Sequence, residues 1–119
     1  MDVQMMKFPT ALYFILAIGY NVVSLVRRDM NRPALAPTEP VQAIVMMALL
    51  YVIYASEPVL GRTAWTALIV VFVSLIARFG IYRHLVRYTS DDYSSRIAWV
   101  AAIAINAYGV LALCLALVL

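Results

Sequence analysis

The sequence predicts an all-α integral membrane protein, a four-transmembrane-helix bundle with both termini outside the cytoplasm. Three observations predict this fold class: 66% of the 119 residues are hydrophobic, only 13% are charged, and the charges gather between long apolar segments. A helix needs about 20 apolar residues to cross the hydrocarbon core of a bilayer. We therefore expect a single transmembrane domain over residues 1–119, with helices at approximately 8–27, 41–57, 64–83 and 96–118.

The first apolar segment begins after Lys7 and stops at Arg27 and Arg28. It is longer than the apolar core of a signal peptide, ~7–15 residues, and it lacks a small-x-small cleavage site, so we interpret it as a retained span. The stretch that follows contains three prolines, which end the helix and predict a stiff, extended turn. These are Pro33, Pro37 and Pro40.

The remaining spans are bounded by polar residues. Glu39 precedes the second span, where a carboxylate complements the helix N-terminus and could also face Arg27, Arg28 or Arg96. The third span opens with Trp65 and closes with Tyr82, which is typical of aromatic belts at the two membrane interfaces. Arg96 opens the fourth span.

Basic residues are distributed unevenly between the two sides of this topology. The first and third turns are rich in arginine, which predicts that they are cytoplasmic by the positive-inside rule. They contain Arg27, Arg28, Arg32, Arg83, Arg87 and Arg96, whereas the other side has only Lys7 and Arg62. A bacterial inner membrane with periplasmic termini fits this count.

Composition argues against several classes of protein. The net charge of +3 suits anionic lipid headgroups better than nucleic acid, so no nucleic-acid partner is expected. Cys114 is the only cysteine and His84 the only histidine, which predicts no internal disulfide and neither metal nor haem.

Arg78 is the most informative residue, because it lies inside the third span. A charge at that depth needs a partner or a wet cavity, although a long side chain can also snorkel to the headgroups. Ser74, Arg78 and Tyr82 follow i, i+4, i+8 and share one helix face, which we expect to point into the bundle.

Other polar residues in the spans are interpreted as helix contacts. Tyr13, Tyr20, Asn21 and Ser24 lie on one broad face of the first span, and polar groups in lipid commonly join helices. In the fourth span Asn106 shares a face with small residues, a pattern that also favours helix packing. The small residues are Ala98, Ala102 and Gly109.

The basic turns form a positive mouth over an apolar bundle. Such a mouth suits an amphiphile with an anionic head, for example a phospholipid, a fatty acyl carboxylate or glutathione. It gathers Arg27, Arg28, Arg78, Tyr82, Arg83, Arg87 and Arg96, with Glu39 as the nearby acid.

The order of these features resembles the membrane-associated proteins in eicosanoid and glutathione metabolism (MAPEG). These have four helices and an active site near the cytoplasmic leaflet, between subunits of a trimer. The resemblance lies in Arg27-Arg28 at the end of the first helix, Glu39 at the start of the second, Ala77-Arg78 with Tyr82 in the third, and Arg96-Ile97-Ala98-Trp99 opening the fourth. Ala36 departs from the family's Asn-x-x-Glu motif.

The resemblance implies a glutathione-dependent transferase or isomerase that acts on lipophilic substrates as a homo-oligomer. Glutathione would be held by Arg27, Arg28, Glu39, Arg78 and Tyr82, and Arg96 or Ser95 would stabilise its thiolate. The alternative is a non-catalytic accessory or scaffolding subunit of a larger membrane complex. A small dimeric exporter fits least, because such chemistry usually needs a carboxylate within the membrane and none of the six acidic residues falls there in the expected topology.

Overall fold

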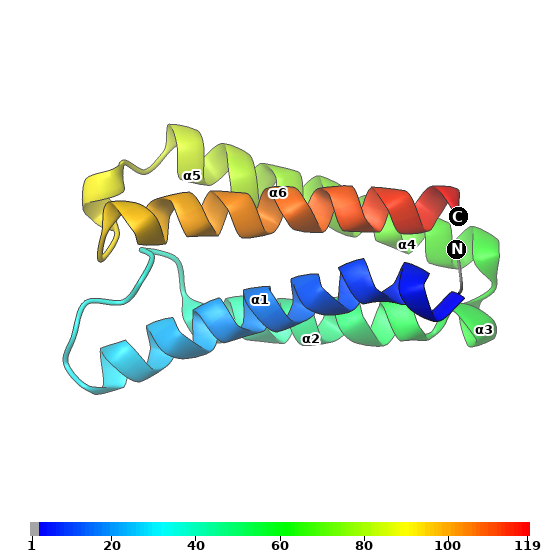
Figure 1. Cartoon of the computed structure of the whole chain (residues 1–119), viewed down its shortest axis with the longest axis horizontal. Coiled ribbons are helices and arrows are strands. Elements are labelled where there is room, and N and C mark those ends of the chain that lie inside the picture. The colour runs from blue at the N-terminus through cyan, green and yellow to red at the C-terminus, as the bar shows by residue number, and fades with distance from the viewer. Residues whose placement is uncertain (1–2) are drawn as a thin grey trace.

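The computed structural model describes residues 3–119, and these form a bundle of helices with no strand (Figure 1). The elements are α1 (Val3–Asp29), α2 (Pro40–Ala55), α3 (Glu57–Leu60), α4 (Arg62–Leu75), the π-helix η1 (Ile76–Tyr82), α5 (Arg83–Val86), the 3-10 helix η2 (Ser90–Asp92) and α6 (Arg96–Val118). The segments predicted at 8–27, 41–57, 64–83 and 96–118 correspond to α1, to α2, to α4 with η1, and to α6. Helix α1 begins earlier than predicted, so Pro9 lies within it.

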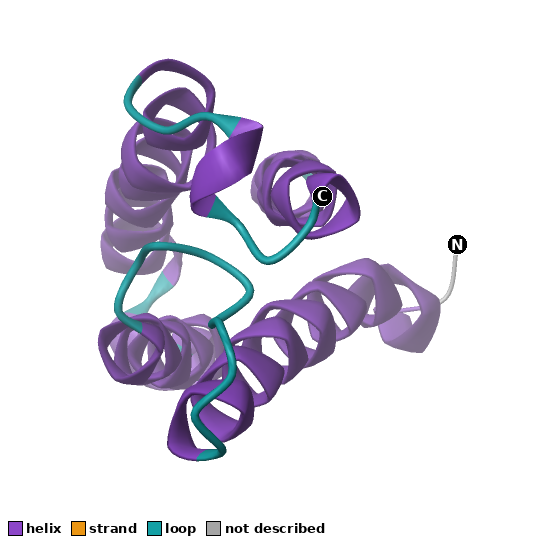
Figure 2. Ribbon diagram, turned by 90° about the vertical axis from the view of Figure 1, so that its left-hand side faces the viewer, coloured by secondary structure: helices purple, strands orange, loops and turns teal. Residues whose placement is uncertain are grey.

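Two helical hairpins make up the bundle. Helix α1 packs against α2, and the continuous rod of α4, η1 and α5 packs against α6. The hairpins meet where α1 contacts α6 and where α2 contacts α4. Figure 2 shows these rods arranged around a common axis, with the loop between α1 and α2 crossing one end.

Buried residues form two separate clusters. The larger one includes Tyr13, Leu50, Trp65 and Leu113, and it joins all four rods. The smaller one contains Ala36, Tyr93, Ala98 and Ala102, and it joins the α1–α2 loop to the start of α6. The second cluster lies at the end of the bundle that carries the basic turns.

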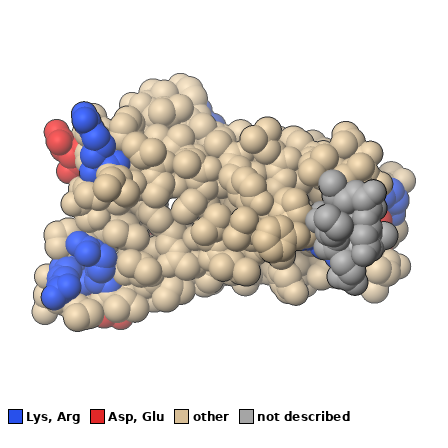
Figure 3. All heavy atoms as spheres, in the orientation of Figure 1, with Lys and Arg blue, Asp and Glu red and all other residues tan. Residues whose placement is uncertain are grey.

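In the described part of the chain, three helices are long and apolar enough to cross a membrane, namely Lys7–Asp29, Arg62–Val86 and Arg96–Val118. Helix α2 is also apolar but shorter, with 16 residues. On the face drawn in Figure 3 most charged side chains lie at the two ends of the bundle, and the surface between the ends is almost entirely uncharged. This distribution is typical of an integral membrane protein.

Candidate ligand-binding cavity

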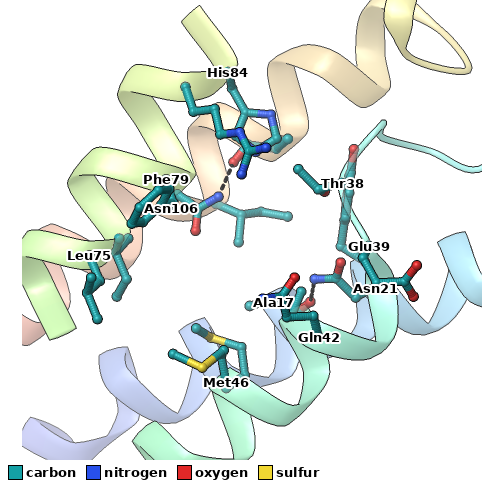
Figure 4. Close-up of a pocket in the computed structure, with 18 of the residues that line it drawn as sticks. Ala17, Asn21, Thr38, Glu39, Gln42, Met46, Leu75, Phe79, His84 and Asn106 are labelled. Carbon is teal, nitrogen blue, oxygen red and sulfur yellow. Dashed lines mark hydrogen bonds between the residues drawn. The ribbon is translucent and has the colours of Figure 1, made fainter. Parts of the chain in front are cut away.

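A cavity of about 500 Å³ lies between the two hairpins, toward the basic turns. All four rods line it, and its lining changes in character along the bundle axis. The deep part is apolar and is formed mainly by Ala17, Met46, Met47, Phe72, Leu75 and Ile76. The part near the turns is polar and is formed by Asn21, Thr38, Glu39, Gln42, Arg83, His84, Tyr88 and Asn106, several of which are labelled in Figure 4.

One side of the cavity is closed by the seam between α1 and α6. The Tyr13 side chain is fully buried, and its ring occupies the space beside Gly109. The Tyr20 hydroxyl donates a hydrogen bond to the Ala98 carbonyl oxygen, 2.8 Å away. These contacts join the two helices along their length, because Tyr13 and Tyr20 lie two turns apart on α1.

The opposite side of the cavity is open. Helix α2 contacts α4, but among the described residues it contacts neither η1 nor α5. Ala43 on α2 and Phe79 on η1 line the cavity on the two sides of this gap. Helix α2 therefore lies apart from η1 and α5, which leaves a lateral opening between them.

Arg83 is the cation of the cavity. Its side chain is partly buried, and its Nε atom is buried with no hydrogen-bond partner among the described residues. The guanidinium carbon lies 5.5 Å from the centre of the Tyr88 ring, which is a cation–π distance. The nearby Glu39 carboxylate accepts hydrogen bonds from Arg28 at 2.9 and 3.1 Å, so it already has a cationic partner. Arg83 thus presents a guanidinium able to bind an anion.

Two asparagines add hydrogen-bonding groups to the cavity wall. Asn21 Nδ2 donates to the Ala17 carbonyl oxygen and Asn106 Nδ2 donates to that of Ala102, each at 2.8 Å (Figure 4). These bonds satisfy one amide N–H each and fix the side chains against their own helices. An amide has a second N–H and a carbonyl oxygen. The Asn106 carbonyl oxygen, Oδ1, accepts a hydrogen bond from the Tyr13 hydroxyl at 3.5 Å, so the wall keeps the second N–H of each amide and the Asn21 carbonyl oxygen for a ligand.

His84 anchors the polar end of the cavity. Its side chain is only 5% exposed, and its Nδ1 atom is hydrogen-bonded to the Tyr93 hydroxyl. The His84 carbonyl oxygen also accepts a hydrogen bond from Trp99 Nε1 at 3.1 Å. Burial raises the pKa of Tyr93, so this phenol stays neutral. The pair ties α5 to the turn before α6.

The structure brings together part of the predicted site in the turn between α1 and α2. Glu39 caps α2 by accepting the Val41 N–H at 3.1 Å, and it pairs with Arg28. The hydrogen bond from Val41 and the Arg28 guanidinium hold the pKa of Glu39 below its usual range. Arg27 Nε donates to the Pro33 carbonyl oxygen at 2.8 Å. The predicted capping and pairing of Glu39 are confirmed.

The prediction that the face of Ser74, Arg78 and Tyr82 points into the bundle is wrong. All three side chains are exposed on the outside of α4 and η1. The Arg78 guanidinium stacks on Tyr82, with its carbon 5.0 Å from the ring centre, and Ser74 Oγ donates to the Val70 carbonyl oxygen at 2.9 Å. Neither Arg78 nor Tyr82 lines the cavity.

Ser95 and Arg96, the predicted catalytic pair, lie at the start of α6. Ser95 Oγ accepts the Ala98 N–H at 3.0 Å and so caps the helix. Arg96 is exposed, and neither residue lines the cavity. The predicted residues therefore occupy three separate places: the α1–α2 turn, the outer face of the π-helix, and the N-terminus of α6.

Among the polar cavity residues, sequence reasoning did not assign Asn21, Thr38, Gln42, His84, Tyr88 or Asn106 to a site. The sequence holds a signal for the three amides, because the apolar spans carry few side-chain amides and Asn21, Gln42 and Asn106 fall on three different spans. Asn106 was interpreted as a helix contact, and it does approach Gly80 closely. No three His, Cys, Asp or Glu side chains in the described part come together as metal ligands.

The fold and the cavity define a class, a small helical membrane protein with a ligand-sized space between its helices. Comparisons with models of protein families, with curated proteins and with solved structures found no match. The cavity itself is therefore the basis for a functional argument.

Proposed function

We propose that this protein binds an amphiphile with an anionic head in the cavity between its two hairpins. The observation that carries the proposal is Arg83, the cation that lines the polar end of the cavity and forms no salt bridge with any described residue. A guanidinium without a carboxylate partner can form charge-assisted hydrogen bonds with a bound carboxylate or phosphate. Pockets of roughly 300–1,000 Å³ are the usual size for small-molecule ligands.

The same proposal places the protein in the bilayer with its basic end in the cytoplasm. Six arginines in the first and third turns against two basic residues at the other end favour this orientation. Helix α2 is the fourth span in this arrangement. Its 16 residues extend about 24 Å, so the bilayer thins locally or flanking residues reach toward the headgroups.

Retention of lipid during purification tests the proposal. Native mass spectrometry of the detergent-solubilised protein should show one retained anionic amphiphile per chain in the wild type and in Arg78→Gln, but not in Arg83→Gln. Arg78 is the matched control, because it lies on the same helical rod and faces outward. Equal retention in both variants, or none in the wild type, would contradict the proposal.

A glutathione-dependent transferase or isomerase is a second candidate, and the position of Arg78 favours it. In a family where the active site lies between subunits, an arginine within the span that faces outward is placed to act across a subunit contact. Arg78 stacks on Tyr82 on that outer face. The same surface would serve a larger membrane partner if the protein is an accessory subunit.

Calorimetry distinguishes this second candidate from the first. Saturable glutathione binding that is lost in Arg78→Ala and retained in Arg83→Gln would support an intersubunit site, especially if the protein runs as a trimer. Absence of glutathione binding by the folded protein would remove this candidate and leave cavity binding of an amphiphile unaffected.

A further inference from the structure

The lateral opening gives the cavity a route to the bilayer. The α1–α6 seam is closed by Tyr13 and Tyr20, whereas α2 does not contact η1 or α5. Residues on both sides of this gap line the cavity, with Ala43 on α2 and Phe79 on η1. A ligand dissolved in the surrounding leaflet can therefore enter sideways, without first passing into water.

Polarity changes steeply along the gap. On α2 the lining passes from Gln42 to Met46 within about 6 Å, one helical turn. On the facing rod it passes from Arg83 through Phe79 to Phe72 in the same direction. The ligand must match this gradient, with a polar head toward the basic turns and an apolar tail toward the middle of the bundle.

Within the described part of the chain, the cavity offers one unpaired positive charge to the head group of a ligand. Arg83 lines the cavity and forms no salt bridge with any described residue, whereas Arg28 is paired with Glu39. The His84 ring is bonded through Nδ1 to Tyr93, and Asn21 and Asn106 are neutral donors and acceptors. A guanidinium matches a carboxylate or a phosphodiester by two parallel hydrogen bonds. A single negative charge is thus neutralised.

The volume suits one acyl chain. About 500 Å³ lies in the lower half of the usual range for small-molecule pockets, and the apolar part is a fraction of it. A second chain would have no wall to contact and would remain in the lipid outside the gap. Flexible methionines at the deep end, Met46 and Met47, allow chains of different shape.

From these observations we infer that the ligand is a single-chain lipid with one negative charge, which enters through the gap between α2 and η1 and places its head on Arg83. This inference rests on the proposed function and narrows it to a lipid class and a route. The head is a carboxylate, as in a fatty acid, or a phosphodiester, as in a lysophospholipid.

A panel of lipids tests the inference on the full chain in nanodiscs of zwitterionic lipid. The panel contains oleate, oleoyl lysophosphatidylglycerol, dioleoyl phosphatidylglycerol and the neutral oleyl alcohol. We expect both single-chain anions to bind more tightly than the other two. Arg83→Gln should lower the affinity for both single-chain anions about 10–100-fold, the loss expected for a hydrogen-bonded charge. It should leave the affinity for the alcohol unchanged. Arg78→Gln should change none of them.

The outcomes separate the inference from the proposed function. If no amphiphile binds, the proposed function fails. If amphiphiles bind, but the alcohol or the two-chain lipid binds as tightly as the single-chain anions, only the inference on ligand class is overturned. Preference for one anion alone identifies the head as carboxylate or phosphodiester.

The route has its own test. Tryptophan at Ala43 would obstruct the gap, whereas tryptophan at Val45, an exposed α2 residue outside the cavity lining, would not. Stopped-flow association of oleate should be slower in Ala43→Trp than in Val45→Trp. Gln42→Trp obstructs the same gap from an exposed position and covers the case in which Ala43→Trp does not fold. Unchanged rates in the obstructed variants would overturn lateral entry.

Discussion

Replacement of Gly109 by alanine should destabilise the bundle, because Tyr13 fills the space that the new methyl group needs. A Cβ atom built on Gly109 would lie 2.6 Å from Tyr13 Cδ1, and other ring atoms would be closer still. The Tyr13 side chain is 0% exposed, so it has no free space to move into. The substitution therefore acts directly on the closed seam between α1 and α6.

The magnitude follows from two opposing contributions. Non-bonded carbons prefer separations of about 3.5–4.0 Å, so the ring or the α6 backbone must move by about 1 Å or more. Overpacking of this kind costs about 1–3 kcal/mol. Alanine gains about 1 kcal/mol over glycine within a helix. Since Tyr13 is fully buried, the cost lies at the upper end, and the net loss of stability is about 2 kcal/mol.

Thermal unfolding in one detergent, followed by circular dichroism, measures this effect. Gly19→Ala is the matched control, because Gly19 also lies in a helix but nothing lies within 4 Å of its built Cβ. The control should stabilise the protein by roughly 0.5–1 kcal/mol. If Gly109→Ala unfolds at the same temperature as Gly19→Ala or above it, the tight seam derived from the structure is incorrect.

Two other predictions concern the seam and the α1–α2 turn. Tyr20→Phe removes the hydrogen bond to the Ala98 carbonyl oxygen and should lower the free energy of unfolding by about 0.5–1.5 kcal/mol in denaturant titration, while Tyr51→Phe, an exposed control, should have little effect. The pKa of Glu39 is held below its usual 4.5, so the carboxylate stabilises the fold above that pH and its contribution is lost as the pH falls through the folded pKa. Glu39→Gln should therefore melt lower than wild type near neutral pH and converge with it in acid; a constant difference at every pH would contradict this assignment.

The sequence was sufficient to predict the helical class and the local structure of the turns. Proline-rich residues 30–40 do separate α1 from α2, and Glu39 does cap α2. These features depend on backbone chemistry that acts within a few residues. The small-residue stripe was also informative: Ala98, Ala102 and Gly109 are buried, as their predicted role in helix contacts requires.

The direction of the Arg78 face could not be predicted, and the reason is physical. In a soluble helix the polar face marks the outside, but here both lipid and bundle interior are apolar. Large apolar side chains are accordingly exposed on every span, for example Val22, Val71 and Leu111. A periodic polar face in such a helix indicates which residues lie together, and not which way they point.

Sequence patterns could not predict the cavity. It exists because α1 contacts α6 whereas α2 does not contact η1 or α5, and this arrangement depends on contacts between residues far apart in the chain, such as Tyr20 with Ala98. The π-helical turn Ile76–Tyr82 adds a local change of helical period that a 3.6-residue pattern does not describe. Arg83 was assigned to the basic mouth, and its burial became evident only from the packing around it.

Photo-crosslinking tests the central claim most directly, because it locates a bound amphiphile on the chain. Oleate that carries a diazirine at the end of its chain would be irradiated with the protein in nanodiscs, and the labelled residues identified by peptide mass spectrometry. The account predicts labels on the deep cavity residues Met46, Met47 and Phe72, suppressed by excess unlabelled oleate and by Arg83→Gln. Labels confined to outward-facing residues such as Val45 and Val70, unaffected by either treatment, would contradict it.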